Sequence, residues 1–260
     1  MKNYYHIEAT KEDHTATIWL SRPEKRNAIN AQMAVELIEI LTLLTSDEQT
    51  YIVLLRGRGD AFCAGADLTW MESQTLPHEE QPENLLPRLL KKLFYFPKPI
   101  IAVVHGSAMG GALGMIACAD YVLAEENSRF AFSEVRLGLI PATIAPFVVR
   151  RIGEFKAREL MICGAAIEAF QALEAGLVSI IAPASALEEE KENLCNLLRI
   201  NAPKAMQKCK QLLQHIAENQ FNDELFDYCT DKLREVRKGD EAREGIMAFK
   251  EKRKAVWRIH

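Results

Sequence analysis

The chain of 260 residues has only six cysteines, and none of them is placed for a metal site or a disulfide framework. No C-x-x-C pair is present, and the wide, irregular spacings argue against both zinc and a disulfide scaffold. The histidines have no metal-ligand spacing either. We therefore expect no metal, and the unpaired cysteines indicate a reducing, cytoplasmic setting. The six are Cys63, Cys118, Cys163, Cys195, Cys209 and Cys229.

The hydropathy of the sequence also predicts no membrane-spanning segment and no signal peptide. One stretch, Ile100–Ala119, has twenty residues without a formal charge, which is the length of a membrane-spanning helix. It contains His105 and four glycines, so we interpret it as a buried strand, a glycine turn and a buried helix. Residues 1–20 lack the apolar core of a signal peptide. No membrane association is expected.

The chain has no excess of positive charge. Its formal net charge is −4, and its three tryptophans do not alternate with basic residues as they do in a nucleic-acid platform. Nucleic acid is therefore not expected as a partner. The charge is uneven, however, since residues 201–260 contain 13 Lys and Arg against 10 Asp and Glu.

Apolar strands alternate with helical patterns through the first 200 residues. Such an alternation predicts an α/β fold whose sheet is covered on both faces. A charged amphipathic helical segment follows, so we divide the chain into a core of residues 1–200 and a C-terminal segment of residues 201–260. Asn30 is predicted to cap the first helix, and Pro77–Pro87 is predicted to be an exposed loop. The predicted strands are Thr15–Leu20, Tyr51–Leu55, Ile100–Val104, Tyr121–Ala124, Phe130–Phe132 and Leu177–Ile181, and the clearest helices are Ala31–Leu44 and Arg88–Tyr95.

Two loops of small residues follow apolar strands. The first, Asp60–Leu68, surrounds Gly65; the second, Gly106–Gly111, opens a helix. Amide N–H groups at a helix N-terminus are unpaired and favour negative charge, so the second loop suits an oxyanion. Its glycines have neither the dinucleotide-binding nor the P-loop spacing. A tight strand-to-helix connection is the alternative for each loop.

Glu134 is the candidate proton carrier. It directly follows an apolar strand and enters a loop rich in glycine and proline, so burial is expected to raise its pKa. The alternative is a helix cap or an ion pair with Arg136. His105, beside the second loop, is predicted to have a structural hydrogen bond.

Taken in order, these segments resemble the enoyl-CoA hydratase/isomerase, or crotonase, family. The resemblance covers most of the chain and implies a spiral of ββα turns with a C-terminal helical oligomerisation segment. It also implies that the amides of Ala66 and Gly111 hold the oxygen of an acyl-CoA thioester, which is the substrate, with no separate cofactor. The motifs that carry it are Arg22–Asn30, Phe62–Asp67, His105–Asp120, Phe130–Pro141 and Glu244–Lys254.

The same resemblance implies a binding surface for CoA and an assembly. Phe249 and Lys252 would approach the CoA of a neighbouring subunit, in a homotrimer or a dimer of trimers joined by the C-terminal helices. The positive charge of residues 201–260 suits the phosphates of CoA. The residues expected to contact CoA within one subunit are Lys25, Arg26, Ala28, Ala64, Asp67 and Leu68.

The chain departs from the family at one catalytic position. Typical hydratases have a glutamate on the helix after the glycine turn, where this chain has Gly114, and only Glu134 remains. One carboxylate can orient water and relay its proton in a hydration, or move a proton between C2 and C4 as an enoyl-CoA isomerase does. Residues 66–71, 110–114 and 133–139 are similar to bacterial methylglutaconyl-CoA hydratases of leucine breakdown, so hydration is the prediction and isomerisation the alternative.

A protein without enzymatic activity is a further alternative. Basic clusters at Arg150–Arg151 and Lys252–Lys254 would then belong to a CoA-binding or RNA-binding protein. The acidic net charge weighs against RNA.

Overall fold

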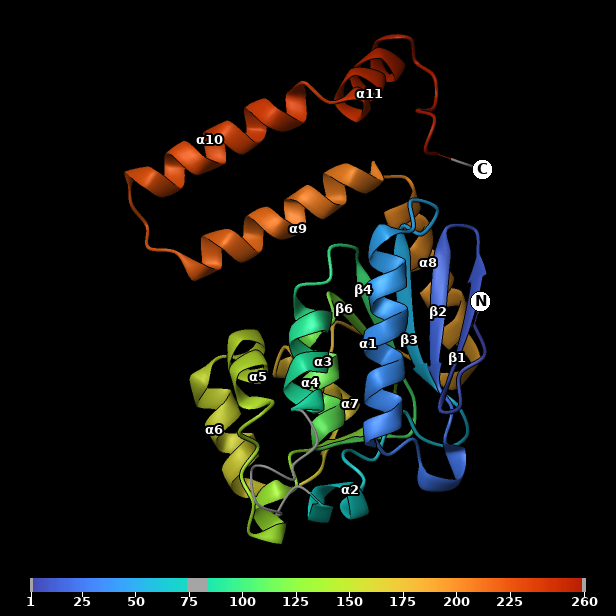
Figure 1. Cartoon of the computed structure of the whole chain (residues 1–260), viewed down its shortest axis with the longest axis vertical. Coiled ribbons are helices and arrows are strands. Elements are labelled where there is room, and N and C mark those ends of the chain that lie inside the picture. Colours follow the sequence, from blue (N-terminus) through green and yellow to red (C-terminus); the bar gives the residue numbers. More distant parts are fainter. Residues whose placement is uncertain (1, 74–83, 259–260) are drawn as a thin grey trace.

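A six-stranded sheet forms the centre of the molecule (Figure 1). The structure is a computed structural model that describes residues 2–73 and 84–258. β1 and β2 are antiparallel and all other neighbouring strands are parallel. The strands predicted at Thr15–Leu20 and Ile100–Val104 are confirmed residue for residue. In spatial order the strands are β1 (Ile7–Glu12), β2 (Thr15–Leu20), β3 (Ile52–Gly57), β4 (Ile100–Val104), β6 (Tyr121–Glu125) and β9 (Ile180–Ala182).

A second, three-stranded sheet lies beside the first. It consists of β5 (Ser107–Met109), β7 (Arg129–Ala131) and β8 (Ile167–Glu168). The prediction of a plain glycine turn after β4 is therefore wrong in part, because three residues of that turn pair with β7. β8 is also absent from the predicted strands, since two residues are too few to show an alternating pattern.

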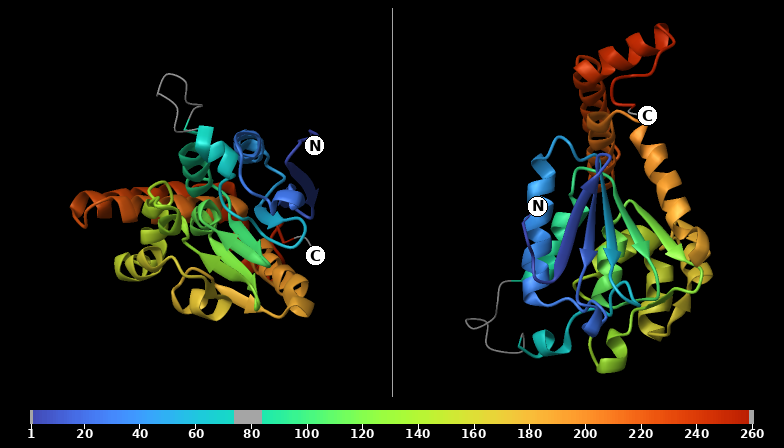
Figure 2. Two further views of the ribbon diagram at one scale, coloured as in Figure 1. Left: turned by 90° about the horizontal axis from the view of Figure 1, so that it is seen from below. Right: turned by 90° about the vertical axis from the view of Figure 1, so that its right-hand side faces the viewer.

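Alternate residues of the central strands face two separate apolar layers. In β3, Val53 and Leu55 pack on one side of the sheet, and Ile52 and Leu54 pack on the other. Figure 2 shows α1 on one face and α8 on the opposite face. This arrangement confirms the α/β fold with both faces covered. The layer on the first face contains α1 (Ala31–Ser46), α3 (Leu85–Phe94) and α4 (Gly111–Cys118), and α8 (Leu187–Arg199) covers the second.

Local signals place the helices of the first face. The side chain of Asn30 accepts a hydrogen bond of 2.9 Å from the backbone N–H of Met33, as the predicted cap requires. Every residue of α4 is buried, so the uncharged stretch after Lys98 forms β4, β5 and α4 in the core. Across residues 2–73 and 84–258, no helix combines the length and the hydropathy that a membrane crossing needs.

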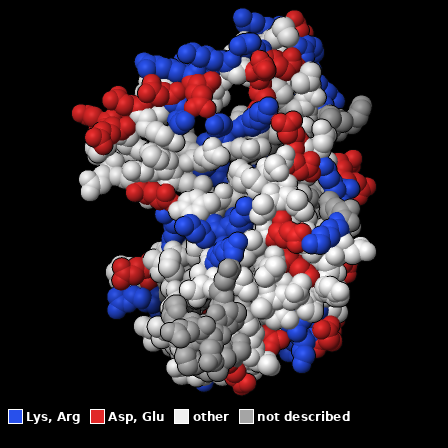
Figure 3. All heavy atoms as spheres, in the orientation of Figure 1, with Lys and Arg blue, Asp and Glu red and all other residues white. Residues whose placement is uncertain are grey.

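The C-terminal helices project from the core (Figure 1). Their buried residues are only Leu225 and Ala248. Figure 3 shows acidic and basic side chains interspersed over this end of the molecule, without a basic groove on that face. The predicted helical segment after residue 200 is thus confirmed. Its helices are α9 (Pro203–Glu218), α10 (Asp223–Arg237) and α11 (Asp240–Lys250).

Short helices surround the carboxyl ends of the parallel strands. Most of the loop predicted at Pro77–Pro87 lies outside the described residues, and Leu85 already begins α3. The remaining helices are α2 (Leu68–Ser73), α5 (Ala145–Ile152), α6 (Glu154–Cys163) and α7 (Ala169–Glu174), with 3₁₀ turns at Pro23–Lys25, Glu134–Leu137 and Ala184–Ala186.

Candidate active site

Backbone hydrogen bonds hold the two glycine-containing loops together. The N–H of Cys63 donates to the carbonyl of Ser107 at 3.1 Å, and the N–H of Met109 donates to the carbonyl of Cys63 at 3.0 Å. The imidazole of His105 lies 2.7 Å from the carbonyl of Gly59, which agrees with its predicted structural role. The loop after β3 therefore lies directly against β5 and the start of α4.

The amides of Ala66 and Gly111 meet at this contact. Ile29 bonds to both neighbours of Ala66, through Gly65 and Asp67, so the N–H of Ala66 faces away from Ile29. A β-carbon placed on Gly111 would lie 3.6 Å from the nitrogen of Ala66. Within the described part of the chain, neither N–H donates a hydrogen bond. Two adjacent, unused donors are the arrangement that an oxyanion needs.

Glu134 lies next to these donors. One oxygen of its carboxylate is 3.3 Å from the place of a β-carbon on Gly110, whose φ of +49° favours glycine. The other oxygen is buried and has no hydrogen-bond partner among the described residues. Burial raises the pKa of Glu134, as the sequence pattern predicts. Among the described residues no ion pair joins Glu134 to Arg136, so the alternative of such a pair is not supported.

The donors and Glu134 open onto one cavity of about 630 Å³. Of the residues expected to bind CoA, Lys25, Ala28, Ala64, Asp67 and Leu68 line it, whereas Arg26 does not. Among residues 2–73 and 84–258, no group of three or more His, Cys, Asp or Glu side chains is placed to hold a metal ion. The apolar residues that line it include Trp70, Leu86, Pro87, Leu137, Ile140, Pro141 and Ile144.

The carboxylate of Asp67 is used in structural contacts. It pairs with Arg22 at 3.2 Å and accepts a hydrogen bond of 3.0 Å from the backbone N–H of Thr69. Arg22 also donates to the carbonyl of Ala28 at 2.6 Å. Despite burial, these partners hold the pKa of Asp67 below its usual range. Asp67 therefore fixes the segment that carries Ala66.

Gly114 does not line the cavity, and the space that a side chain at position 114 would need is already filled by other residues. A β-carbon there would lie 2.5 Å from Cγ2 of Ile144 and 3.1 Å from Cδ1 of Leu90. The structure therefore has no room at position 114 for a second carboxylate. Sequence reasoning missed Ile144, because an isoleucine in an apolar loop gives no signal of the helix it will pack against.

Phe249 and Lys252 lie far from the cavity of their own chain. Phe249 belongs to α11 and is 85% exposed, and Lys252 follows in an exposed turn. In Figure 1, α11 and α2 are at opposite ends of the molecule. Their contact with the CoA of a neighbouring subunit stays a prediction.

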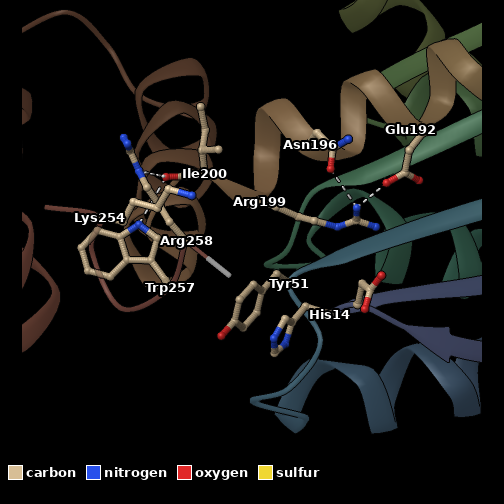
Figure 4. Close-up of a pocket in the computed structure, with 10 residues that line it drawn as sticks. His14, Tyr51, Glu192, Asn196, Arg199, Ile200, Lys254, Trp257 and Arg258 are labelled. Carbon is tan, nitrogen blue, oxygen red and sulfur yellow. Dashed lines mark hydrogen bonds and ion pairs between the residues drawn. The ribbon is translucent and has the colours of Figure 1, made fainter. Parts of the chain in front are cut away.

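A second cavity, of about 520 Å³, lies at the amino ends of the parallel strands (Figure 4). Here Arg199 donates to Glu192 at 2.5 Å and to Asn196 at 3.0 Å. The ring of His14 stacks on Tyr51 with centroids 4.2 Å apart. Arg199 and Glu192 thus neutralise each other, and no carboxylate among the described residues that line this cavity is both buried and unpartnered, unlike Glu134 beside the amides of Ala66 and Gly111.

Comparisons with known proteins agree with this geometry. The sequence model of the family described as enoyl-CoA hydratase/isomerase matches residues 10–259. The crystal structure of an enoyl-CoA hydratase from Shewanella pealeana superimposes with a TM-score of 0.92 at 36% identity, covering 97% of this chain and 96% of that chain. The predicted crotonase fold is confirmed.

Two curated relatives have more specific names. The 2,3-dehydroadipyl-CoA hydratase of Escherichia coli is 31% identical over 210 residues, covering 80% of this chain and 82% of its own. The mevalonyl-coenzyme A hydratase of Aspergillus fumigatus is 31% identical over 252 residues, covering 94% and 92%. Both names describe hydratases of CoA thioesters.

Proposed function

Because the chain belongs to the enoyl-CoA hydratase/isomerase family, we propose that it is a hydratase that adds water across the 2,3 double bond of an enoyl-CoA thioester. The observation that carries the proposal is the Glu134 carboxylate, which has one unpartnered oxygen and shares a cavity with two adjacent backbone amides. The names of the similar hydratases support it.

The two amides stabilise the charge that develops on the substrate. As oxygen bonds to C3, negative charge moves from the double bond onto the thioester oxygen. The N–H groups of Ala66 and Gly111 would donate to that oxygen, and one such donor is worth about 3–4 kcal/mol in other enzymes. Because backbone hydrogen bonds of neighbouring residues hold the two loops together, these amides need little reorganisation during the reaction.

Glu134 would carry the proton of the added water. Its carboxylate accepts a proton from water while the oxygen of that water bonds to C3, and it then returns the proton to C2. The product contains one water more than the substrate, and the carboxylate is regenerated. A pKa raised by burial makes Glu134 a stronger base than an exposed glutamate, which suits this role.

The identity of the acyl group is proposed from sequence motifs. Residues 66–71, 110–114 and 133–139 favour 3-methylglutaconyl-CoA, an intermediate of leucine breakdown. The wall beside Glu134 contains the apolar residues Leu137, Ile140 and Ile144. Among the described residues that line the cavity, the cation is Lys25, which is expected to bind CoA rather than a second carboxylate. An uncharged enoyl-CoA is therefore the competing substrate for the same chemistry.

Isomerisation is the second candidate reaction. It is favoured by Gly114, because a single carboxylate is enough to remove a proton from C2 of a 3-enoyl-CoA and return it to C4. The same two amides would stabilise the intermediate enolate. No water enters the product in this case.

We also propose that the enzyme works as a homotrimer or a dimer of trimers. Large apolar side chains are exposed on the C-terminal helices and the turn between α9 and α10, and burying them between subunits would be favourable. Assembly would also explain how Phe249 and Lys252 reach a CoA. The apolar side chains include Leu213, Phe221, Phe226, Leu233, Ile246 and Met247.

The decisive experiment is a panel of acyl-CoA substrates with product masses measured. Crotonyl-CoA and 3-methylglutaconyl-CoA should gain the mass of one water, and Glu134→Gln serves as the control for contaminating activity. Conversion of a 3-enoyl-CoA without a mass change, with no hydration of either 2-enoyl-CoA, would establish the isomerase instead. Binding without turnover of any substrate would leave a CoA-binding protein.

A further inference from the structure

Gly114 and Ile144 share one volume inside the fold. A β-carbon on Gly114 would lie 2.5 Å from Cγ2 and 3.0 Å from Cβ of Ile144. Real β-carbons do not approach other atoms so closely, so the side chain of Ile144 occupies the place where a side chain at 114 would begin. Leu90 of α3 touches the same volume from another side, at 3.1 Å.

Ile144 cannot easily leave this place. It is 2% exposed, and its backbone N–H donates to the carbonyl of Pro141 at 3.2 Å. The next residue, Ala145, donates to the same carbonyl at 2.9 Å, and Val148 donates back to the carbonyl of Ile144 at 3.1 Å. These bonds form the start of α5 and fix where the isoleucine side chain points.

The same side chain lines the cavity that contains Glu134. The carboxylate of Glu134 is 3.3 Å from the place of a β-carbon on Gly110, and Gly114 lies in the first turn of the helix that starts directly after Gly110. Position 114 is about one helical turn, or 5.4 Å, further along the axis of α4 than Gly110. With the thioester oxygen at Gly111, C3 and its substituents would extend toward Ile144.

We propose that Ile144 is a specificity-determining residue that limits the width of the acyl group at C3. By filling the volume of the missing side chain at 114, it provides an apolar wall where another chain could hold a polar group. The inference rests on the proposed function, because it assumes that the thioester oxygen is held at Ala66 and Gly111. A branch at C3 then meets Ile144, whereas a straight chain passes it. Of the two proposed substrates, the inference therefore favours an unbranched enoyl-CoA over 3-methylglutaconyl-CoA, which has a methyl at C3.

The experiment compares two saturated, unreactive ligands, butyryl-CoA and 3-methylbutyryl-CoA, which differ only by a methyl at C3. Their dissociation constants are measured by calorimetry for wild type, Ile144→Val and Leu90→Val. Each variant removes one methylene from a side chain that packs beside Gly114, and Ile144 lines the cavity whereas Leu90 does not. Ile144→Val should shift the affinity ratio toward the branched ligand about tenfold, and Leu90→Val should leave the ratio unchanged.

An unchanged ratio in Ile144→Val, or an equal shift in Leu90→Val, overturns the proposal. Because binding alone is measured, the test does not depend on turnover. If the wild type binds both ligands with Ile144-dependent discrimination but converts no enoyl-CoA, the proposed function fails and the specificity role stands.

A second measurement tests the shared volume without any ligand. Gly114→Ala should lower the thermal midpoint strongly in the wild type, and clearly less in an Ile144→Ala background, where the atom 2.5 Å away is gone. Equal losses in both backgrounds would show that the two residues do not compete for space. The combination with Leu90→Val provides the matched control for general loosening of the core.

Discussion

The two ends of the central sheet carry cavities of comparable size, about 630 and 520 Å³, whose polar groups behave differently. At the carboxyl ends of the parallel strands, two amides and one oxygen of Glu134 lack partners in the described chain. At the amino ends, Arg199 is paired with Glu192 and Asn196 (Figure 4). The second cavity also has a buried atom without a partner, Nε of Arg199. A buried carboxylate oxygen beside two unused amide donors, rather than cavity volume, therefore distinguishes the candidate active site.

The difference has a backbone origin. Parallel strands leave loops at their carboxyl ends that run into helix N-termini, so free N–H groups gather there. In this chain the loop before α4 turns at Gly110 with a positive φ and presents Gly111 at that position. The amino ends of the strands are reached from turns and from the end of α8, which bring charged side chains of both signs.

The largest effect should come from Glu134→Gln. Replacing the carboxylate by an amide of the same shape removes proton transfer and should lower kcat by about 10²–10⁴-fold, while acyl-CoA affinity changes little. Steady-state kinetics and a binding titration on the same preparation check both parts. Near wild-type turnover in Glu134→Gln would show that the carboxylate is not the proton carrier.

Removing one amide donor should have the next largest effect. Gly111→Pro deletes the N–H at the first position of α4, where proline is well tolerated in helices. We expect kcat to fall by about 10²–10³-fold. Gly111→Ala is the control, because its β-carbon would make only ordinary contacts at 3.6 Å or more and the N–H is kept. Equal activity of the two variants would contradict the assignment of this amide.

Breaking the pair in the other cavity should change stability and leave turnover alone. Arg199→Ala removes the bonds to Glu192, Asn196 and Thr15. Because the pair is partly exposed, the loss should be about 1 kcal/mol, or about 2–4 °C in the thermal midpoint. Calorimetry and an activity assay measure the two effects. A large fall in kcat would give the second cavity a role in the reaction.

A stability change of similar size separates the energetic cost of burying Glu134 from its role in proton transfer. Burial raises the pKa of Glu134 in the folded state, so the native protein binds more protons than the unfolded chain between the two pKa values. Wild-type stability therefore falls as pH rises through that window. Glu134→Gln should melt a few degrees higher than wild type at neutral pH and equally below the ordinary carboxyl pKa. A lower midpoint at neutral pH would contradict the burial cost.

Local sequence patterns predicted the regular elements of the sheet well. β2 and β4 were recognisable because their apolar residues form short, uninterrupted or alternating runs, and Asn30 marks the start of α1. β5 and β8 were not, because strands of two or three residues depend on a distant partner. β1 was not separated from β2, since its exposed face is polar and its hairpin turn at Asp13 lacks glycine.

The candidate site divides in the same way. The glycine loop that opens a helix after an apolar strand already pointed to an oxyanion site, and the position of Glu134 to a buried acid, whereas Ala66 and Gly111 were predicted as the two donors from the family resemblance. The absence of a second acid at Gly114 was also visible in the sequence. These properties depend on neighbours along the chain, which the sequence displays directly.

Packing between distant segments decided the rest. That Ile144 fills the volume beside Gly114, that Arg22 occupies Asp67, and that Glu134 lacks a partner all depend on side chains brought together over long separations. Close packing in the interior makes such contacts specific to a few tenths of an ångström, which no local pattern encodes. The sequence by itself determines which segments form strands and helices, and the packing of these elements determines the shape of the cavity that contains Glu134.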